Sequence, residues 1–383
     1  MAYLDHAASS PLRPAARDAW LAAVAEPGNP ASRHAQGRRA AARVESARQA
    51  VAALMGCLPA HVVFTASGTE ANNLAILGAA AAMEAEGRAR RSLHTAIEHS
   101  CVRGPHAALA ARGWEVEVLP VDGAGRVIPG ALREALARGP SLVSIMAVNN
   151  EMGVVQDLGP MGAEVRAAGA WLHVDAVQAL GVLDPAPWGA DLLSVSAHKL
   201  GGPQGIGALA VGGRARLRPV LHGGPHEAGR RPGTLAVAAI AAFGSAAGEA
   251  LAARHQEAAR LARLRDRLES GILAVVPAAR VLGDGAWRAP HLSSVVFPGL
   301  TGEALVEQLD LAGVAASTGA ACTVLGTPGS PVLRALGLSE AEVQGSLRLS
   351  LGWNSTEVEV DAAVRAVGRV AAALAVPSLA RRD

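Results

Sequence analysis

The chain has 383 residues, of which 50% are hydrophobic and 18% are charged. A single hydrophobic core stops growing at about 250–300 residues, so a chain of this length is expected to form two structural units. Its 35 basic and 33 acidic residues nearly cancel, which argues against direct binding of nucleic acid through charge and against an acidic disordered tail.

The basic residues are almost all arginine. Of the 35 Lys and Arg residues, one is a lysine, Lys199, and all the others are arginine. Any chemistry that needs an amine side chain must therefore use Lys199.

Three cysteines, Cys57, Cys101 and Cys322, stand far apart and form no C-x-x-C pair. An odd number of cysteines, with no apolar leader after Met1, predicts reduced thiols and a cytoplasmic protein. Apolar runs are interrupted before they reach membrane-spanning length, and the longest, 235–247, has the length of a buried helix. These short runs predict no membrane span. Because no H-E-x-x-H or paired Cys/His spacing occurs, we expect no metal site.

The first predicted elements are a helix and a strand that leads into a second helix. Residues 38–55 place apolar side chains at helical spacing, and Gly56 follows as a C-cap. Residues 62–65 are β-branched or aromatic and predict a strand. Ser67 and Glu70 then have the spacing of a capping box at the start of an Ala-rich helix.

Three further strands are predicted, and each ends in polar residues. The continuous apolar run 141–148 is typical of a parallel strand covered on both faces, and it ends at Asn149 and Asn150. Strands over 171–174 and 192–195 end at Asp175 and Ser196. This alternation with helices predicts a doubly wound, mostly parallel sheet, in which ligands bind beyond the carboxyl ends of the strands.

The pattern changes after residue 250. A long Arg-rich amphipathic helix is followed by short apolar segments at 291–297 and 347–351, which is typical of a smaller α+β unit. We therefore expect a large α/β domain over residues 13–250 and a smaller α+β domain formed by residues 1–12 and 251–383.

The predicted strand ends bring together the groups that a particular cofactor needs. Gly68 and Thr69 at a helix N-terminus suit a phosphate, although such turns more often only cap a helix. Asp175 at a buried strand end needs a cationic partner. Together with Lys199, these residues suggest pyridoxal phosphate, held as a Schiff base and protonated on its ring nitrogen. The ordinary alternative for any one lysine is an exposed surface position.

Successive segments of the chain resemble the signatures of the cysteine desulfurases, which belong to the class V aminotransferase group. They are TASGTEANN (65–73), EH (98–99), VNNEMG (148–153), HVDAVQ (173–178) and SAHK (196–199). Further matches are GNPAS (28–32), HGGPHE (222–227), RPGT (231–234), GAAC (319–322) and SLRLSLG (346–352). Because the matches follow in order from Tyr3 to Gly352, the resemblance implies a pyridoxal-phosphate-dependent transferase of fold type I.

The resemblance also implies a role for each matching residue. Lys199 carries the cofactor and moves the substrate proton, Asp175 holds the ring nitrogen protonated, and His99 stacks on the ring. Asn150 and Gln178 bond the ring hydroxyl. The expected phosphate ligands are Gly68, Thr69, Ser196, His198 and, from the second subunit of a homodimer, Thr234. Arg348 clamps the substrate carboxylate, with Asn29 nearby.

Cys322 is the nucleophile that the resemblance implies. Its thiolate takes sulfur from L-cysteine, which leaves an enzyme persulfide and L-alanine. The twelve residues from Cys322 to Leu333 suggest the long-loop type, which donates sulfur to iron–sulfur scaffolds and tRNA-thiolation enzymes. We expect Cys57 and Cys101 to be inert thiols.

Two other kinds of protein share parts of this pattern. One is another enzyme of the same fold, such as a selenocysteine lyase or an aminotransferase, and the other is a non-catalytic scaffold for sulfur assembly. The combination of Lys199, Asp175 and Arg348 weighs against a scaffold, since a scaffold needs none of the three.

Overall fold

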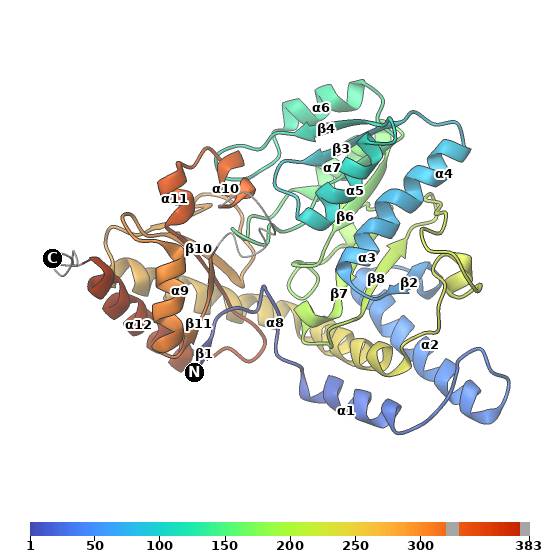
Figure 1. The fold of residues 1–383 in the computed structure, drawn as a ribbon, viewed down its shortest axis with the longest axis horizontal. Coiled ribbons are helices and arrows are strands. Elements are labelled where there is room, and N and C mark those ends of the chain that lie inside the picture. The colour runs from blue at the N-terminus through green and yellow to red at the C-terminus, as the bar shows by residue number, and fades with distance from the viewer. Residues whose placement is uncertain (319–328, 376–383) are drawn as a thin grey trace, which may run out of the picture.

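A computed structural model describes residues 1–318 and 329–375. Within these residues, the larger sheet has the strand order β2-β8-β7-β6-β5-β3-β4 (Figure 1). The bounds of its strands are β2 Val62–Thr65, β3 Arg91–Thr95, β4 Glu115–Leu119, β5 Leu142–Ser144, β6 Trp171–Asp175, β7 Leu192–Ser196 and β8 Gly207–Val211. Strands β4, β3, β5, β6 and β7 run parallel, whereas β8 is antiparallel to β7 and to β2. The predicted doubly wound α/β sheet is confirmed.

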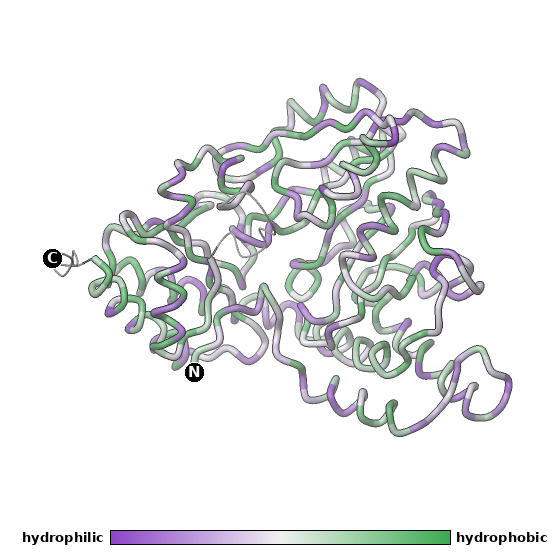
Figure 2. Tube along the Cα trace, in the orientation of Figure 1, coloured by the Kyte–Doolittle hydropathy of each residue, from purple (hydrophilic) through white to green (hydrophobic). Residues whose placement is uncertain are grey.

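The strands are covered on both faces because alternate side chains point to opposite sides of a sheet. Val62, Leu172 and Leu193 belong to one hydrophobic cluster, while their chain neighbours belong to another. Helices α2 (Ala35–Met55), α6 (Pro129–Ala137) and α7 (Leu158–Ala167) pack on the first face. The second face is covered by α3 (Gly68–Asn73), α4 (Ala79–Ala85) and α5 (Ser100–Ala110). Figure 2 shows hydrophobic residues along the central strands and hydrophilic ones in outer loops such as that before α2.

The local predictions for the first half agree with these elements. Helix α2 ends at Met55, and Gly56 follows in the left-handed region with φ 64°. Ser67 caps α3 by accepting a hydrogen bond from the Glu70 N–H. The Glu70 carboxylate accepts from Ala66 N instead of Ser67 N, so the expected capping box is only half formed.

A second, antiparallel sheet has the order β12-β13-β10-β9 among the described residues. Its strands are β9 Arg280–Val281, β10 Leu292–Val296, β12 Ser317–Thr318 and β13 Ser346–Ser350. The helices beside it are α9 (Gly302–Leu311), α10 (Pro331–Ala335), α11 (Glu340–Gln344) and α12 (Glu357–Ala375). The N-terminal strand β1 (Ala2–Tyr3) pairs with β11 (Val314–Ala315), which places the start of the chain in the smaller unit (Figure 1).

Helix α8 (Val237–Val275) joins the two sheets and packs against α1 (Pro14–Val24), α2 and α12. Phe243 belongs to the core of the larger unit, and Leu264 and Leu268 belong to the core of the smaller one. The helix therefore runs without interruption across residue 250, where we expect the domain boundary. By length and composition α8 could cross a membrane, but its large apolar residues Phe243, Leu264 and Leu268 lie in these two cores, as in the central helix of a folded protein.

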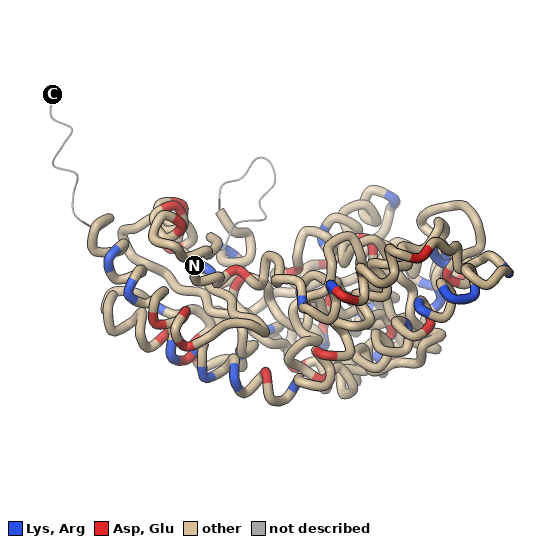
Figure 3. Tube along the Cα trace, turned by 90° about the horizontal axis from the view of Figure 1, so that it is seen from below, with Lys and Arg blue, Asp and Glu red and all other residues tan. Residues whose placement is uncertain are grey.

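Charged residues of both signs occur along the whole length of the molecule (Figure 3). Many form ion pairs between neighbouring elements, such as Arg48 with Glu227 and Arg288 with Glu269. This distribution agrees with the nearly neutral composition.

Candidate active site

A cavity of about 290 Å³ lies beyond the carboxyl ends of β5, β6 and β7, between the two units. Most of the residues that the sequence assigned to a site line it, although they come from distant parts of the chain. They are Gly68, Thr69, His99, Asn150, Asp175, Gln178, Ser196, His198, Lys199 and Arg348. Parallel strands place their ends at one edge, which explains why these segments meet.

Lys199 lies in the short helical turn after β7 and faces this cavity. Its Nζ donates hydrogen bonds to the carbonyl oxygens of Ala7 at 2.5 Å and Ala8 at 2.8 Å. The N-terminal segment thus holds the amine in position. Gln178 also donates to Ala7 O, at 2.9 Å.

Asp175 ends β6 and is 6% exposed. Its Oδ1 accepts from Val177 N at 3.0 Å, and its Oδ2 accepts from Asn72 Nδ2 at 2.8 Å. A carboxylate can accept more than two hydrogen bonds, so Asp175 can accept another. Asp175 also lines the cavity. It is therefore placed to accept a hydrogen bond from a cationic N–H group of a ligand.

The start of α3 forms a cradle opposite β7. The helix continues through the π-turn Leu74–Gly78 into α4, so its first N–H groups carry the partial positive charge of a longer helix. A Cβ on Gly68 would meet Val177 Cγ2 at 3.0 Å and Ser196 Cβ at 3.2 Å. Only glycine lets the backbone approach Ser196 this closely, so an anion here meets both N–H and hydroxyl donors.

His198 and His99 stand on opposite sides of the cavity. Burial, with a smaller effect of the Lys199 charge, lowers the pKa of His198 to about 4. Burial also lowers the pKa of His99. The Nδ1 of His99 accepts from Cys101 N at 3.2 Å, so its Nε2 carries the proton of the neutral ring. Both imidazoles are neutral near pH 7.

Arg348 reaches the cavity from β13 of the smaller unit and is 3% exposed. Its Nη2 donates to Asp5 Oδ1 at 2.9 Å and its Nη1 to Asn150 O at 3.2 Å. The buried Nε has no hydrogen-bond partner within the described residues. A guanidinium whose donors are only partly used can bind an additional carboxylate.

Three predicted residues are not among the described residues that line this cavity. Asn29 is exposed in the loop before α2, where its side chain accepts from Ala31 N. Thr234 is exposed in the segment before α8. Cys322 lies outside the described residues.

Two residues that contact the site were not assigned a role from the sequence. Asn72 lies one turn after Gly68 on the same helical stretch and bonds Asp175. Cys101 lines the cavity, with its Sγ 2.9 Å from His99 Nδ1. The i, i+4 spacing of Gly68 and Asn72 is a signal that could have identified the asparagine.

Two buried glutamates lie close to the cavity. Glu98 accepts hydrogen bonds from Thr95 Oγ1 and Met146 N, and burial together with the nearby Asp175 raises its pKa to about 8. Glu151 accepts from Ser330 Oγ, and burial raises its pKa to about 7. The Glu151 contact attaches the chain that follows residue 328 to the large unit.

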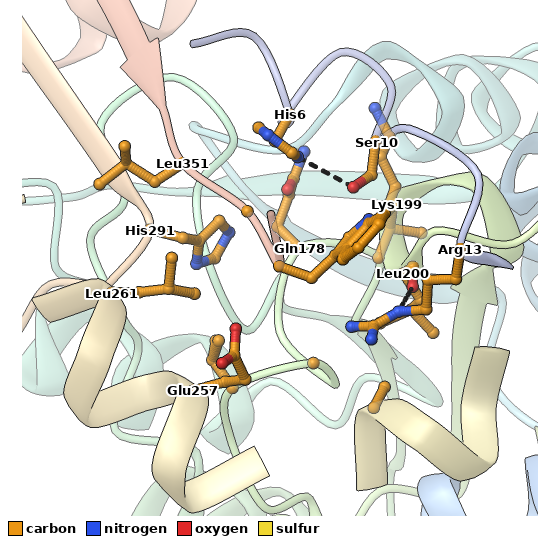
Figure 4. A pocket seen from close by; sticks show the side chains of 16 residues that line it. His6, Ser10, Arg13, Gln178, Lys199, Leu200, Glu257, Leu261, His291 and Leu351 are labelled. Atoms are coloured by element: carbon orange, nitrogen blue, oxygen red, sulfur yellow. Dashed lines mark hydrogen bonds between the residues drawn. The ribbon is translucent and has the colours of Figure 1, made fainter. Parts of the chain in front are cut away.

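A smaller cavity of about 60 Å³ lies behind Lys199 and Gln178 (Figure 4). His6, which bonds Ser10 at 2.9 Å, and His291 lie on one side of it, and Glu257 of α8 lies on another. This volume is large enough to admit water. Among residues 1–318 and 329–375, no three His, Cys, Asp or Glu side chains are placed to hold a metal ion.

The fold and the cavity are those of an α/β enzyme with a lysine at the carboxyl edge of its sheet. The family model of aminotransferase class V matches residues 2–363. An IscS-like cysteine desulfurase of Mycobacterium tuberculosis is 41% identical, with 97% of each chain covered. A solved NifS-like protein superposes with a TM-score of 0.90 at 31% identity, covering 97% of this chain and 99% of its own.

A further solved structure, of SspA in complex with cysteine, has a TM-score of 0.79 at 29% identity and covers 92% of this chain and 99% of its own. The chain belongs to the aminotransferase class V family and, within it, to the cysteine desulfurases. The family resemblance predicted from the sequence is confirmed, and with it the transferase fold of type I.

Proposed function

We propose that this protein is a pyridoxal-phosphate-dependent cysteine desulfurase that removes sulfur from L-cysteine and releases L-alanine. The observation that carries the proposal is the position of Lys199, the one lysine of the sequence, which faces Asp175 and Arg348 across a single cavity. The names of the relatives and the cysteine complex of SspA support the same substrate.

The residues of the cavity fit the cofactor. The N–H groups at Gly68 and Thr69, with Ser196 and His198, offer a cradle for the phosphate that a Cβ on Gly68 would fill. Asp175 would hold the ring nitrogen, Asn150 and Gln178 the ring hydroxyl, and His99 the ring face. When bound, this group stabilises negative charge at the substrate α-carbon.

Arg348 binds the carboxylate of L-cysteine in this proposal. Its Nε has no partner within the described residues, and its buried position strengthens the attraction to a second anion. Lys199 removes and returns the α-proton, because the Ala7 and Ala8 carbonyls hold its amine at the cavity. Asn29 is proposed to assist at the carboxylate.

Cys322 accepts the sulfur. Its thiolate attacks the substrate sulfur, so that an S–S bond forms and the C–S bond breaks. The electron pair of the C–S bond stays on carbon, which is protonated to give alanine, and Cys322 becomes a persulfide. Free thiol and L-cysteine thus give persulfide and L-alanine without an external oxidant.

We propose that the enzyme acts as a cytoplasmic homodimer. Thr234 is exposed and is not among the described residues that line the cavity of its own chain, which supports a role at the cavity of a second copy. The persulfide would pass to an iron–sulfur scaffold or to a thiolation enzyme.

The proposal is tested with L-cysteine, added pyridoxal phosphate and a thiol reductant. We expect alanine and sulfide in equal amounts, and at least a thousandfold loss of both in Cys322→Ala. Cys57→Ala is the matched control, since it removes a thiol that is not among the described residues lining the cavity and keeps Cys322. Alanine release at the wild-type rate from Cys322→Ala would contradict the persulfide step and favour a lyase that acts on selenocysteine.

A further inference from the structure

One face of the large sheet carries a layer of buried polar side chains beneath the cavity. Trp171, His173 and Asp175 alternate with apolar residues along β6, so all three point to the side covered by α3 and α5. The register places Ser144 of β5 directly beside His173. Polar groups in a hydrophobic layer are costly unless they bond one another.

These side chains form a continuous series of hydrogen bonds. Asp175 Oδ2 is 2.8 Å from Asn72 Nδ2, and Asn72 Oδ1 is 3.0 Å from His173 Nε2. His173 Nδ1 is 3.0 Å from Ser144 Oγ. The series continues from Ser144 Oγ to His106 Nε2 at 2.9 Å, and from His106 Nδ1 to Ser92 Oγ at 3.1 Å.

The carboxylate at one end determines the direction of these bonds. An ionised carboxylate only accepts, so Asn72 presents its NH₂ group to Asp175 and its oxygen to His173. His173 must then carry its proton on Nε2, which leaves Nδ1 to accept from the Ser144 hydroxyl. Burial lowers the pKa of His173 to about 3, so the ring is neutral.

The same reasoning applies to the far end. Because the Ser144 hydroxyl donates to His173, its oxygen accepts from His106 Nε2–H, and His106 Nδ1 accepts from the Ser92 hydroxyl. Burial also lowers the pKa of His106 well below its usual value. Every hydrogen bond therefore points toward Asp175, and bonds aligned in this way strengthen one another.

We propose that this buried series, from Ser92 through His106, Ser144, His173 and Asn72, holds the Asn72 NH₂ group on Asp175 and so fixes the orientation of the carboxylate. Asn72 is the positioning residue that touches Asp175, and the other four act through it. The effect on a bound cofactor rests on the proposed function, because Asp175 is the expected partner of the pyridine nitrogen. The hydrogen-bond series itself does not rest on that function.

The series explains why histidines occupy the interior of this layer. An aliphatic residue at 173 would leave Asn72 free to rotate its amide and present its oxygen to Asp175. Two oxygens facing each other would repel, and the carboxylate would turn away from its present position. A carboxylate turned in this way would stabilise a protonated ring nitrogen less well.

The test compares Ser144→Ala with Ser194→Ala in the full chain. Both serines contact His173, since Ser194 Oγ lies 3.2 Å from Nε2, but only Ser144 is a member of the series. The first measurement is the tautomer of His173, read from histidine ¹⁵N–¹H correlations without cofactor. The second is the dissociation constant of pyridoxal phosphate and the pH dependence of its bound absorbance.

We expect wild type and Ser194→Ala to show the neutral Nε2–H tautomer of His173 from pH 5 to 9. Ser144→Ala should lose the single tautomer, weaken pyridoxal phosphate binding about tenfold, and lower the pH at which the bound spectrum changes. Ser144→Thr, which restores the hydroxyl, should recover the tautomer. Where Ser144→Ala does not fold, Ser92→Ala serves as the second variant, with the same changes expected at smaller size.

A charged or Nδ1–H form of His173 in wild type at pH 7 would overturn the proposal. Equal cofactor dissociation constants and spectra in Ser144→Ala and Ser194→Ala would overturn it too. Failure of the wild type to take up pyridoxal phosphate would instead refute the proposed function, while the tautomer would still decide the hydrogen-bond series.

Discussion

Single residues at this site owe their properties to burial. Glu98 is 1% exposed and keeps one carboxylate oxygen without a partner within the described residues. Its pKa is raised because burial and the nearby Asp175 charge both disfavour ionisation. Arg348 is also buried, and its guanidinium pairs with Asp5. Burial therefore disfavours the charge of an unpaired carboxyl group and strengthens the attraction between paired charges.

Glu98→Gln is expected to change the pH dependence of stability. The pKa of Glu98 is about 8 when folded, against an ordinary value of 4.5, so the folded state holds its proton more tightly than the unfolded state. The wild type therefore loses stability relative to Glu98→Gln as pH rises from about 4.5 to 8. Urea unfolding of both proteins at pH 5, 7 and 9 measures this, and a difference that stays constant would contradict it.

Arg348→Lys is expected to raise KM for L-cysteine by about 10- to 100-fold, with a smaller change in kcat. An ammonium cannot reproduce two parallel hydrogen bonds to a carboxylate, and a lost charge-assisted bond costs about 1.5–3 kcal/mol. Steady-state kinetics measure the effect. Asp5→Asn is the control, because it removes the partner of Arg348 and keeps the guanidinium. An equal rise in KM there would mean that the ion pair with Asp5, and not the planar guanidinium itself, determines substrate binding.

At the level of elements, the start of α3 is built around a close approach. Its first residue, Gly68, lies against Val177 and Ser196, while Ser67 caps the helix. Helix α3 also carries Asn72, so one helix supplies both the cradle and the contact to Asp175. A shift of this helix would disturb both at once.

Gly68→Ala is expected to weaken pyridoxal phosphate binding at least tenfold. The added Cβ forces Val177 or Ser196 to move and costs about 1–3 kcal/mol in the folded state. Gly248→Ala in α8 is the control, since its Cβ would meet no atom within 4 Å. That change should stabilise the fold by about 0.5–1 kcal/mol without altering cofactor binding. Cofactor titration and urea unfolding measure both, and unchanged binding in Gly68→Ala would contradict the cradle.

For the whole molecule, the cavity needs both units. Lys199 and Asp175 come from the large sheet, Arg348 from the small one, and the N-terminal segment closes over Lys199. Helix α8 connects the two cores. Thr234 is not among the described residues that line the cavity of its own chain, which supports the proposed contribution of a second subunit.

Mixed dimers test this arrangement. Lys199→Ala and Thr234→Ala chains, unfolded together and reassembled, should form dimers in which one site combines both defects and the other has none. Random pairing then gives wild-type affinity for pyridoxal phosphate in about a quarter of the sites. Titration with limiting cofactor counts them, with each variant alone as the control. No sites of wild-type affinity in the mixture would contradict a role for Thr234 across the interface.

Much of the fold and of the site could be predicted because the signals are local. Apolar runs bounded by polar residues predicted β2, β6 and β7, and Gly56 predicted the end of α2. The run 141–148 shows the limit of this reasoning, because β5 ends at Ser144. The backbone N–H groups of Ile145 and Ala147 still donate to carbonyl oxygens of β6. The pairing of β5 with β3, however, ends at Ser144.

The sequence by itself determined the chemistry available to this protein: one lysine, the acid at the end of β6 and the segments that place them on strand ends. These features depend on residue identity and short spacing. The tertiary structure alone decided that Ala7 and Ala8 hold Lys199, that Asn72 bonds Asp175, and that no residue within 1–318 and 329–375 bonds the Nε of Arg348. Such contacts join residues far apart in the chain, so they follow from packing and not from any local pattern.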